Sequence, residues 1–146
     1  MSFIEGGVCA PKGFQASGVI CGIRPNPVKN DLAVVASDEA CTCAGVFTRN
    51  VVKAAPVLLD METVKLGKAR AIIANSGIAN ACAEDCEVNA QKMQQLGAGA
   101  LGLSSDEVLV CSTGIIGQRL NIEAIEEGLP GAVEKLSHSP EGSASA

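Results

Sequence analysis

The stretch "VLVCSTGIIGQRLN", residues 108–121, changes character part-way along. Its first four residues, 108–111, are apolar and largely β-branched, which is typical of a buried strand. Residues 112–114, Ser-Thr-Gly, have the composition of a turn. Asn121 is suited to cap a following helix, which the sequence "IEAIEEGLPGAVEKL" predicts over 122–136. The stretch therefore predicts a strand, a turn and a helix in succession.

A second unit of the same kind lies upstream. The segment "ARAIIANSG" (69–77) predicts a buried strand that ends in a polar turn, and "EDCEVNAQKMQQLGAGALGL" (84–103) predicts a long helix. We expect three apolar residues of that helix to face the core: Val88, Met93 and Leu96. In the helix of the first unit, Gly128 and Pro130 predict a break or a kink.

The first third of the chain alternates strand-like runs with turn residues. The runs "FQASGVICGIR" (14–24), "LAVVASD" (32–38) and "CTCAGVFT" (41–48) predict an antiparallel meander. The run 32–38 is almost entirely apolar or small, which predicts a strand covered on both faces. Pro56 and Gly67 are placed to start and stop a short helix over 56–66. The whole pattern predicts an α/β fold with layered sheets flanked by helices.

Composition supports one globular domain and excludes several functions. The chain has 146 residues, of which 47% are hydrophobic and only 2% aromatic, so its core must be aliphatic. The net charge of −5 argues against a nucleic-acid partner. No apolar run reaches the ~20 residues of a membrane helix, and the first residues lack the pattern of a signal peptide, so we expect a cytoplasmic protein. The small, polar residues 137–146 predict a flexible tail or linker after a domain over 1–136.

Seven cysteines without a secretory signal predict reduced thiols. The pairs Cys41 with Cys43 and Cys82 with Cys86 leave open a thiol or metal module, although neither pair has a common zinc spacing. The single histidine, His138, lies in the expected tail, which argues against a Ser-His-Asp site. We therefore assign no metal site and no resident cofactor.

The turns at 75–81 and 112–117 are the two places where chemistry is expected, and three interpretations apply. Each turn follows a strand and precedes a helix, so backbone N–H groups there can hold a phosphate, although no nucleotide-binding motif is present. The N–H of Gly114 and the hydroxyl of Thr113 can instead form an oxyanion hole. Alternatively, the hydroxyls of residues 112–113 only satisfy backbone groups at the strand end. Because no base for a serine or threonine is present, an oxyanion hole would require a nucleophile from elsewhere, such as an N-terminal threonine.

Four motifs resemble one known family. They are "GGVCAPKGFQASGVICGIR" (6–24), "GVFTRNVVKAAPV" (45–57), "ANSGIANAC" (74–82) and "STGIIGQRL" (112–120). In this order they resemble the N-terminal signatures of the bifunctional ornithine acetyltransferases, also called glutamate N-acetyltransferases. The resemblance covers residues 6–136.

The resemblance implies an arginine-biosynthesis enzyme that moves acetyl from N-acetylornithine to glutamate, with acetyl-CoA as a further donor in bifunctional members. In that family the precursor cuts itself at an Ala-Thr bond, and the new N-terminal threonine of the second (beta) chain carries the acetyl group. The family's Thr-Gly oxyanion hole corresponds to Thr113 and Gly114. The four residues of the other turn, Asn75, Ser76, Gly77 and Asn80, are expected to line or support the site.

The resemblance also carries expectations about fold and assembly. It implies part of an N-terminal-nucleophile-like, aminopeptidase-like sandwich and a heterotetramer of two alpha and two beta chains. The chain matches only the alpha-chain part, and the nucleophilic threonine is not among its residues, so we expect the chain to be inactive alone. The alternative is a catalytically inactive fragment that acts as a binding or assembly module.

Overall fold

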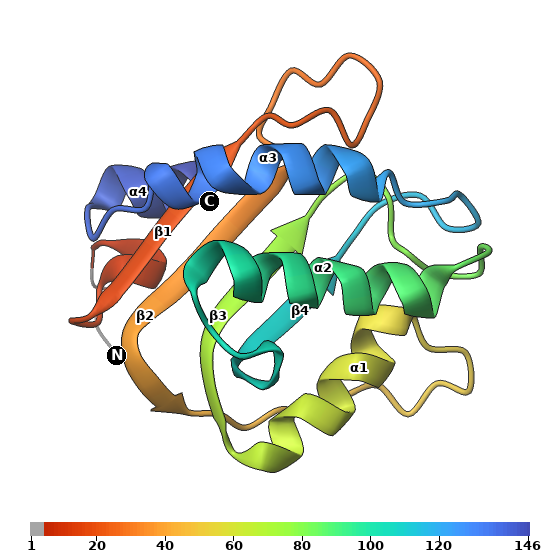
Figure 1. Ribbon diagram of the computed structural model, residues 1–146, viewed down its shortest axis with the longest axis horizontal. Helices are drawn as coiled ribbons and strands as arrows, with labels where there is room; N and C mark the ends of the chain where they lie inside the picture. Colours follow the sequence, from red (N-terminus) through yellow and green to blue (C-terminus); the bar gives the residue numbers. More distant parts are fainter. Residues whose placement is uncertain (1–4) are drawn as a thin grey trace.

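The computed structural model describes residues 5–146, which form a four-stranded sheet with helices packed on it (Figure 1). The strands are β1 (Phe14–Val19), β2 (Leu32–Thr42), β3 (Lys68–Asn75) and β4 (Val108–Ser112), in that order across the sheet. β1 pairs with β2 and β2 with β3 in antiparallel fashion, whereas β3 and β4 are parallel. The antiparallel pairing of the first two runs of the expected meander is confirmed, and so are the two expected strand-turn-helix units, β3 with α2 and β4 with α3.

Within residues 5–146, four α-helices pack on or beside the sheet: α1 (Ala55–Thr63), α2 (Cys86–Leu101), α3 (Ile122–Glu134) and α4 (Pro140–Ser145). Figure 1 shows α2 and α3 side by side across one face of the sheet, with α1 beside β4. Short 3-10 turns precede β1, follow α1 and precede β4, at Gly7–Cys9, Val64–Leu66 and Ser105–Glu107. In the described part of the chain, no helix combines the length and apolar character needed to span a bilayer.

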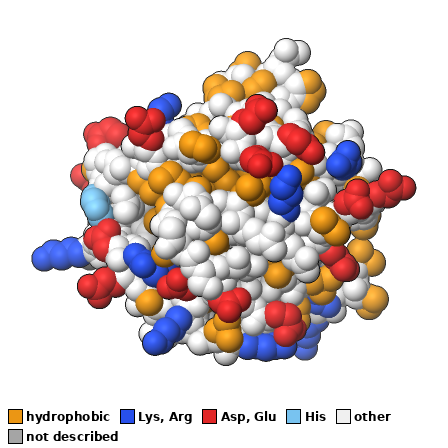
Figure 2. All heavy atoms as spheres, viewed as in Figure 1, with side chains coloured by type: hydrophobic (Ala, Val, Ile, Leu, Met, Phe, Trp, Pro, Cys, Tyr) orange, Lys and Arg blue, Asp and Glu red, His pale blue; other side chains and the backbone are white. Residues whose placement is uncertain are grey.

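The core lies between the sheet and helices α2 and α3. Because side chains alternate along a strand, every second residue points to the helices, and these are the aliphatic residues that are fully buried. They include Leu32, Val34, Ile73, Val108 and Val110. α2 approaches closely at Gly97, where an added Cβ would lie 2.4 Å from Ile73 Cγ1. Figure 2 shows hydrophobic side chains gathered in a strip between α2 and α3, which are also bridged by Lys92 and Glu126 at 3.0 Å.

The other face of the sheet is only partly covered. Helix α4 packs against β1, but Val35 and Leu109 remain half-buried and Ile72 is 37% exposed. The prediction that the run 32–38 is covered on both faces is therefore wrong for the described residues. The residues of this second face are apolar, but within residues 5–146 no layer of helices covers them. We call this side, with Ala33, Val35, Ile72, Ala74 and Leu109, the open face.

Three further local expectations differ from the structure. The run 41–48 is not a separate strand: β2 continues to Thr42 through an irregularity after Ala36, and residues 43–54 then lack a neighbouring strand to pair with. Of the three α2 residues expected to face the core, Met93 is fully buried and Leu96 packs against the core, but Val88 is 61% exposed. The buried face of α2 includes Gln94 instead, whose side-chain amide donates to Val108 O at 2.8 Å. Of the break or kink expected at Gly128 and Pro130, the break does not occur, because α3 continues through Pro130.

The residues expected as a flexible tail are folded against the sheet. The N–H of Ala16 donates to Ser137 O at 3.0 Å, and the N–H of Ser137 donates back to Ala16 O at 3.2 Å. Helix α4 then starts with Ser139 as its cap and Pro140 in its first turn. The small residues of 137–146 led to the expectation of a tail, but in the structure they allow close packing against β1. At Gly18 of β1, an added Cβ would lie 1.8 Å from Ser145 O.

Candidate active-site turn

The parallel pairing of β3 and β4 brings the two chemically interesting turns together. The ladder ends with Asn75 opposite Ser112, and beyond it Ile78 and Ile115 form an isolated parallel bridge. Both turns therefore leave the same edge of the sheet side by side. This edge is the carboxyl end of two parallel strands, which is where α/β proteins commonly place their sites.

The backbone of the turn 112–117 is held by the turn 75–81. The N–H of Thr113 donates to Asn75 O at 3.0 Å, and the N–H of Ile115 donates to Gly77 O at 2.9 Å. The N–H of Gly114, between these two anchored groups, has no backbone acceptor within residues 5–146. Thr113 and Gly114 are both exposed. The two anchored neighbours thus fix a free N–H donor at the surface.

Glycine is required at position 114 for two reasons. Its φ of 135° lies in the region that residues with a Cβ rarely adopt. In addition, an added Cβ would lie 2.1 Å from Gly77 C and 2.2 Å from Gly77 O. Those are backbone atoms, which cannot rotate away as a flexible side chain can. The Ser-Thr-Gly sequence therefore creates a close contact between two backbones and leaves one N–H accessible.

The asparagine side chains around the turn hold nearby backbone carbonyls by hydrogen bonds. The Asn75 side-chain amide donates to Ile78 O at 2.9 Å, and the Asn80 side-chain amide donates to Cys86 O at 3.0 Å. The Oγ of Ser112 is buried but has no hydrogen-bond partner within the described residues. Ser112 therefore does not satisfy a backbone group at the strand end, which was the role considered for it. Thr113, the next residue along, is exposed.

A hollow of about 190 Å³ lies beside Thr113. Its walls come from the start of β2 and the two residues before it, the end of β3 and the residue after it, the turn after β4 and the residue after α4: Asn30, Asp31, Leu32, Ala33, Ala74, Asn75, Ser76, Thr113 and Ala146. Thr113, Asn75 and Ser76 were expected here from the sequence, whereas Asn30 and Asp31 were not. The polar pair directly before the buried strand β2 was the available signal for them.

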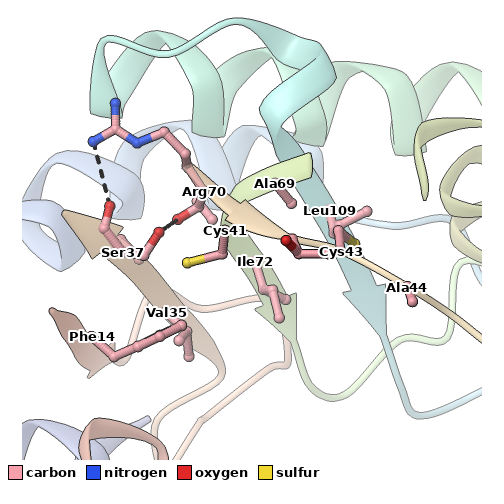
Figure 3. Close-up of a pocket in the computed structure, with 13 residues that line it drawn as sticks. Phe14, Val35, Ser37, Cys41, Cys43, Ala44, Ala69, Arg70, Ile72 and Leu109 are labelled. Atoms are coloured by element: carbon pink, nitrogen blue, oxygen red, sulfur yellow. Dashed lines mark hydrogen bonds between the residues drawn. The ribbon is translucent and has the colours of Figure 1, made fainter. Parts of the chain in front are cut away.

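A larger hollow, of about 260 Å³, lies farther along the open face, toward the start of β3. Figure 3 shows Phe14, Val35, Ile72 and Leu109 around it, with Arg70 at its side. Thr113 and Gly114 are not among its walls. Of these two hollows, only the smaller one has a candidate donor, Thr113, in its wall.

The ionisable groups near the end of β4 supply no nucleophile. Burial raises the pKa of Asp60 in α1 to about 6, although the N–H of Val110 donates to its Oδ1 at 3.1 Å. Burial and the neighbouring Asp60 charge both raise the pKa of the Cys111 thiol. A thiol with a raised pKa stays protonated at neutral pH and is a poor nucleophile.

Neither the phosphate interpretation nor the metal interpretation gains a site. Helix α2 starts only at Cys86 and α3 only at Ile122, so neither turn lies directly at a helix N-terminus. Cys41 and Cys43 line the larger hollow, whereas Cys82 and Cys86 lie next to the start of α2. Within the described part of the chain, no three His, Cys, Asp or Glu side chains are grouped to hold a metal ion.

Residues 15–146, which include both turns, match the sequence pattern of the ArgJ family. The chain belongs to the ArgJ family. Among curated ArgJ proteins, it is 46% identical over 143 residues to the "arginine biosynthesis bifunctional protein ArgJ" of Caldanaerobacter subterraneus subsp. tengcongensis, covering 97% of this chain and 34% of that protein. The chloroplastic ArgJ protein of Zea mays is 45% identical over 145 residues, covering 98% of this chain and 31% of that protein.

Two solved structures of the ArgJ family have the same fold. The ornithine acetyltransferase of Mycobacterium tuberculosis, solved in complex with ornithine, superposes with a TM-score of 0.92 at 39% identity, covering 97% of this chain and 76% of that chain. The ArgJ protein of Bacillus halodurans gives a TM-score of 0.88 at 34% identity, covering 94% and 71%. The expected fold class, an α/β part of an N-terminal-nucleophile-like sandwich, is confirmed. The chain spans about a third of the length of the curated ArgJ relatives it matches.

Proposed function

We propose that this chain is the N-terminal portion of a glutamate N-acetyltransferase that moves acetyl from N-acetylornithine to glutamate. The observation that carries the proposal is the free, exposed N–H of Gly114 held between the anchored N–H groups of Thr113 and Ile115. Such a donor is useful where negative charge develops on an acyl oxygen. Within residues 5–146 we find no activated nucleophile near this donor, and in this proposal the nucleophile is a threonine of a second chain.

In the first half-reaction, the hydroxyl oxygen of that N-terminal threonine attacks the acetyl carbon of N-acetylornithine. Its own α-amine takes the hydroxyl proton. The carbonyl electron pair moves onto the acetyl oxygen, where the Gly114 N–H and the Thr113 hydroxyl donate hydrogen bonds to it. When the oxyanion collapses, the C–N bond breaks, the proton passes to the departing amine, and ornithine leaves an acetyl-threonine ester.

In the second half-reaction, the amine of glutamate attacks the same acetyl carbon. The oxyanion forms again in the same place, so Thr113 and Gly114 act twice per cycle. Collapse breaks the ester bond, returns the proton to the threonine oxygen and releases N-acetylglutamate. Because one group is carried on the enzyme between two substrates, the kinetics are ping-pong. Acetyl-CoA can enter as an alternative acetyl donor at the first step, and no resident cofactor is required.

The open face supports the existence of the second chain. The smaller hollow is bordered on this side by Ala33, Ala74 and Thr113, and the partly exposed Ile72 lies nearby. A second chain seated there buries apolar surface and brings its terminal threonine toward Gly114. We propose that the two chains arise by autocatalytic cleavage, assemble as two copies of each, and work in the cytoplasm.

The direct test is co-expression with the matching second chain, followed by acetyl transfer from N-acetylornithine to glutamate. The proposal predicts activity for the pair and none for either chain alone. It also predicts that Thr113→Val and Gly114→Ala pairs assemble but transfer acetyl more slowly. An assembled pair that is inactive with both substrates would contradict the proposal.

The partly exposed open face also favours a second candidate, a catalytically inactive binding or assembly module. In that case the chain binds its partner through Ile72 and its neighbours, and the hydroxyl of Thr113 has no role. Ile72→Asp would then abolish binding, while Thr113→Val would leave every measurable property of the complex unchanged. A loss of acetyl transfer in Thr113→Val with binding preserved decides for the enzyme.

A further inference from the structure

Asp31, the residue directly before β2, is buried, with only 2% of its surface exposed. Both of its carboxylate oxygens accept backbone hydrogen bonds from the loop after β1. The N–H of Cys21 donates to Oδ1 at 2.7 Å, and the N–H of Ile23 donates to Oδ2 at 2.9 Å. A carboxylate that receives two such bonds holds a loop more strongly than a neutral acceptor does.

The backbone of Asp31 also holds the neighbouring turn. Its N–H donates to Val19 O at 3.0 Å, and its carbonyl accepts from the N–H of Ser76 at 2.9 Å. Ser76 lies in the turn 75–81, next to Gly77. One residue therefore joins the end of β1, the start of β2 and the turn that follows β3.

A second contact links the same loop to Gly77. The loop continues from Ile23, which is 3% exposed in the core, to Arg24. The stem of Arg24 lies against Gly77, because a Cβ added there would be 2.1 Å from Arg24 Cγ and 2.5 Å from Arg24 Cδ. Gly77 in turn accepts the hydrogen bond from Ile115 and contacts Gly114.

We propose that Asp31 is a positioning residue for the oxyanion-binding turn. This inference rests on the proposed function. The backbone carbonyl of Asp31 holds Ser76, and its carboxylate holds the loop that places Arg24 against Gly77. The turn 75–81 then sets the direction of the Gly114 N–H. Both carboxylate oxygens of Asp31 accept from the loop after β1, so its effect on the Gly114 N–H passes through Gly77.

The charge state of the group agrees with this role. Burial alone would raise the pKa of Asp31, but hydrogen bonds from the backbone of Cys21, Ile23 and Arg24 outweigh it, so the pKa lies below its ordinary value. Burial, followed by the charge of Asp31, raises the pKa of the Cys21 thiol to about 12. The carboxylate is therefore ionised at neutral pH beside a protonated thiol.

The test is amide hydrogen exchange, measured residue by residue in the 146-residue chain and in Asp31→Asn. An asparagine can accept only one of the two N–H groups and turns its own NH₂ toward the other. We expect protection of the Ser76, Thr113 and Ile115 amides to fall roughly 10- to 100-fold, the worth of a hydrogen bond to a charged group. Amides in the middle of the β2–β3 ladder should change no more than in the control Asp106→Asn, which alters an exposed carboxylate.

Two results would overturn the proposal. One is unchanged protection at those three amides, and the other is an equal loss at every amide, which would make Asp31 a residue of general stability only. If Asp31→Asn does not fold, Arg24→Ala tests the contact with Gly77: protection should fall at Ile115 and stay at Ser76. Unchanged protection at Ile115 in that variant would contradict transmission through Gly77.

The rate of acetyl transfer gives an independent test. In the assembled two-chain enzyme, Asp31→Asn should lower kcat about ten-fold or more and leave KM unchanged, because the Gly114 N–H acts only on the transition state. An unmodified assembly without acetyl transfer would contradict the proposed function. That failure is distinguishable, because the exchange measurement does not depend on activity.

Discussion

Replacing Gly114 by alanine adds one methyl group at the place where two backbones meet. The new Cβ would lie 2.1 Å from Gly77 C, 2.2 Å from Gly77 O and 2.5 Å from Ile78 N. Because these are backbone atoms, the turn 112–117 must move away from the turn 75–81. The movement stretches the hydrogen bonds that Thr113 and Ile115 donate to Asn75 and Gly77, now 3.0 and 2.9 Å long.

The cost has two parts. A residue with a Cβ in the φ region of Gly114 costs about 1–3 kcal/mol. Weakening the two backbone hydrogen bonds adds about 0.5–1.5 kcal/mol for each. We therefore expect Gly114→Ala to lower the free energy of unfolding by about 2–6 kcal/mol. We also expect it to lower kcat about 10²- to 10³-fold in the assembled enzyme through the displaced N–H donor.

Urea unfolding of the chain measures the first effect, and acetyl transfer by the two-chain enzyme measures the second. Gly99→Ala is the matched control, because Gly99 lies in α2 with no atom within 4 Å of an added Cβ. That variant should be more stable by about 0.5–1 kcal/mol and fully active. The reasoning is refuted if Gly114→Ala unfolds at the same urea concentration as the unchanged chain and transfers acetyl at the same rate.

Three further predictions address separate parts of the structure. Thr113→Val should slow acetyl transfer about ten-fold or more with little change in urea stability, since Thr113 is exposed. Thr113→Ser should restore the rate. Equal rates in the unchanged enzyme and both variants would show that the hydroxyl has no role in acetyl transfer. The pKa of Asp60 is about 6 in the folded chain, raised by burial from an ordinary value of 3.8. Its stabilising effect on the fold is therefore full below pH 3.8 and is lost as pH rises through 6. Asp60→Asn should remove that slope in urea midpoints measured from pH 4 to 7, and an unchanged slope would contradict the raised pKa. Ile73→Ala, at a fully buried position against Gly97, should cost about 2–5 kcal/mol in urea unfolding, and a cost below about 1 kcal/mol would contradict the packing described.

The elements with a strong local pattern could be predicted from sequence. Three features follow from residue types that act within a few positions: the strand before Thr113, the helix after Asn121 and the end at Gly67 of the 3-10 turn that follows α1. The Asn121 side chain accepts from Ala124 N at 3.3 Å, as its place before the helix predicted. The candidate donors Thr113 and Gly114 were found in the same way, because a hydroxyl and a glycine interrupt an apolar run.

Contacts between distant residues could not be predicted in this way. Val88 is an apolar residue of α2, yet it is 61% exposed, whereas the polar Gln94 is buried because Thr63 and Val108 of other elements accept hydrogen bonds from its amide. The contact of Gly114 with Gly77 and the four hydrogen bonds of Asp31 depend on the sheet order. The packing of residues 137–146 on β1 likewise depends on a tertiary neighbour rather than on their own composition.

The most direct test of the account is intact-mass spectrometry of the polypeptides that co-purify with this chain, before and after incubation with N-acetylornithine. The account predicts a second chain that begins with threonine and gains the mass of one acetyl group, and it predicts slower acetylation when this chain carries Gly114→Ala. If no second chain co-purifies, or if the second chain is acetylated at the same rate beside Gly114→Ala, the oxyanion-binding role of this turn is contradicted.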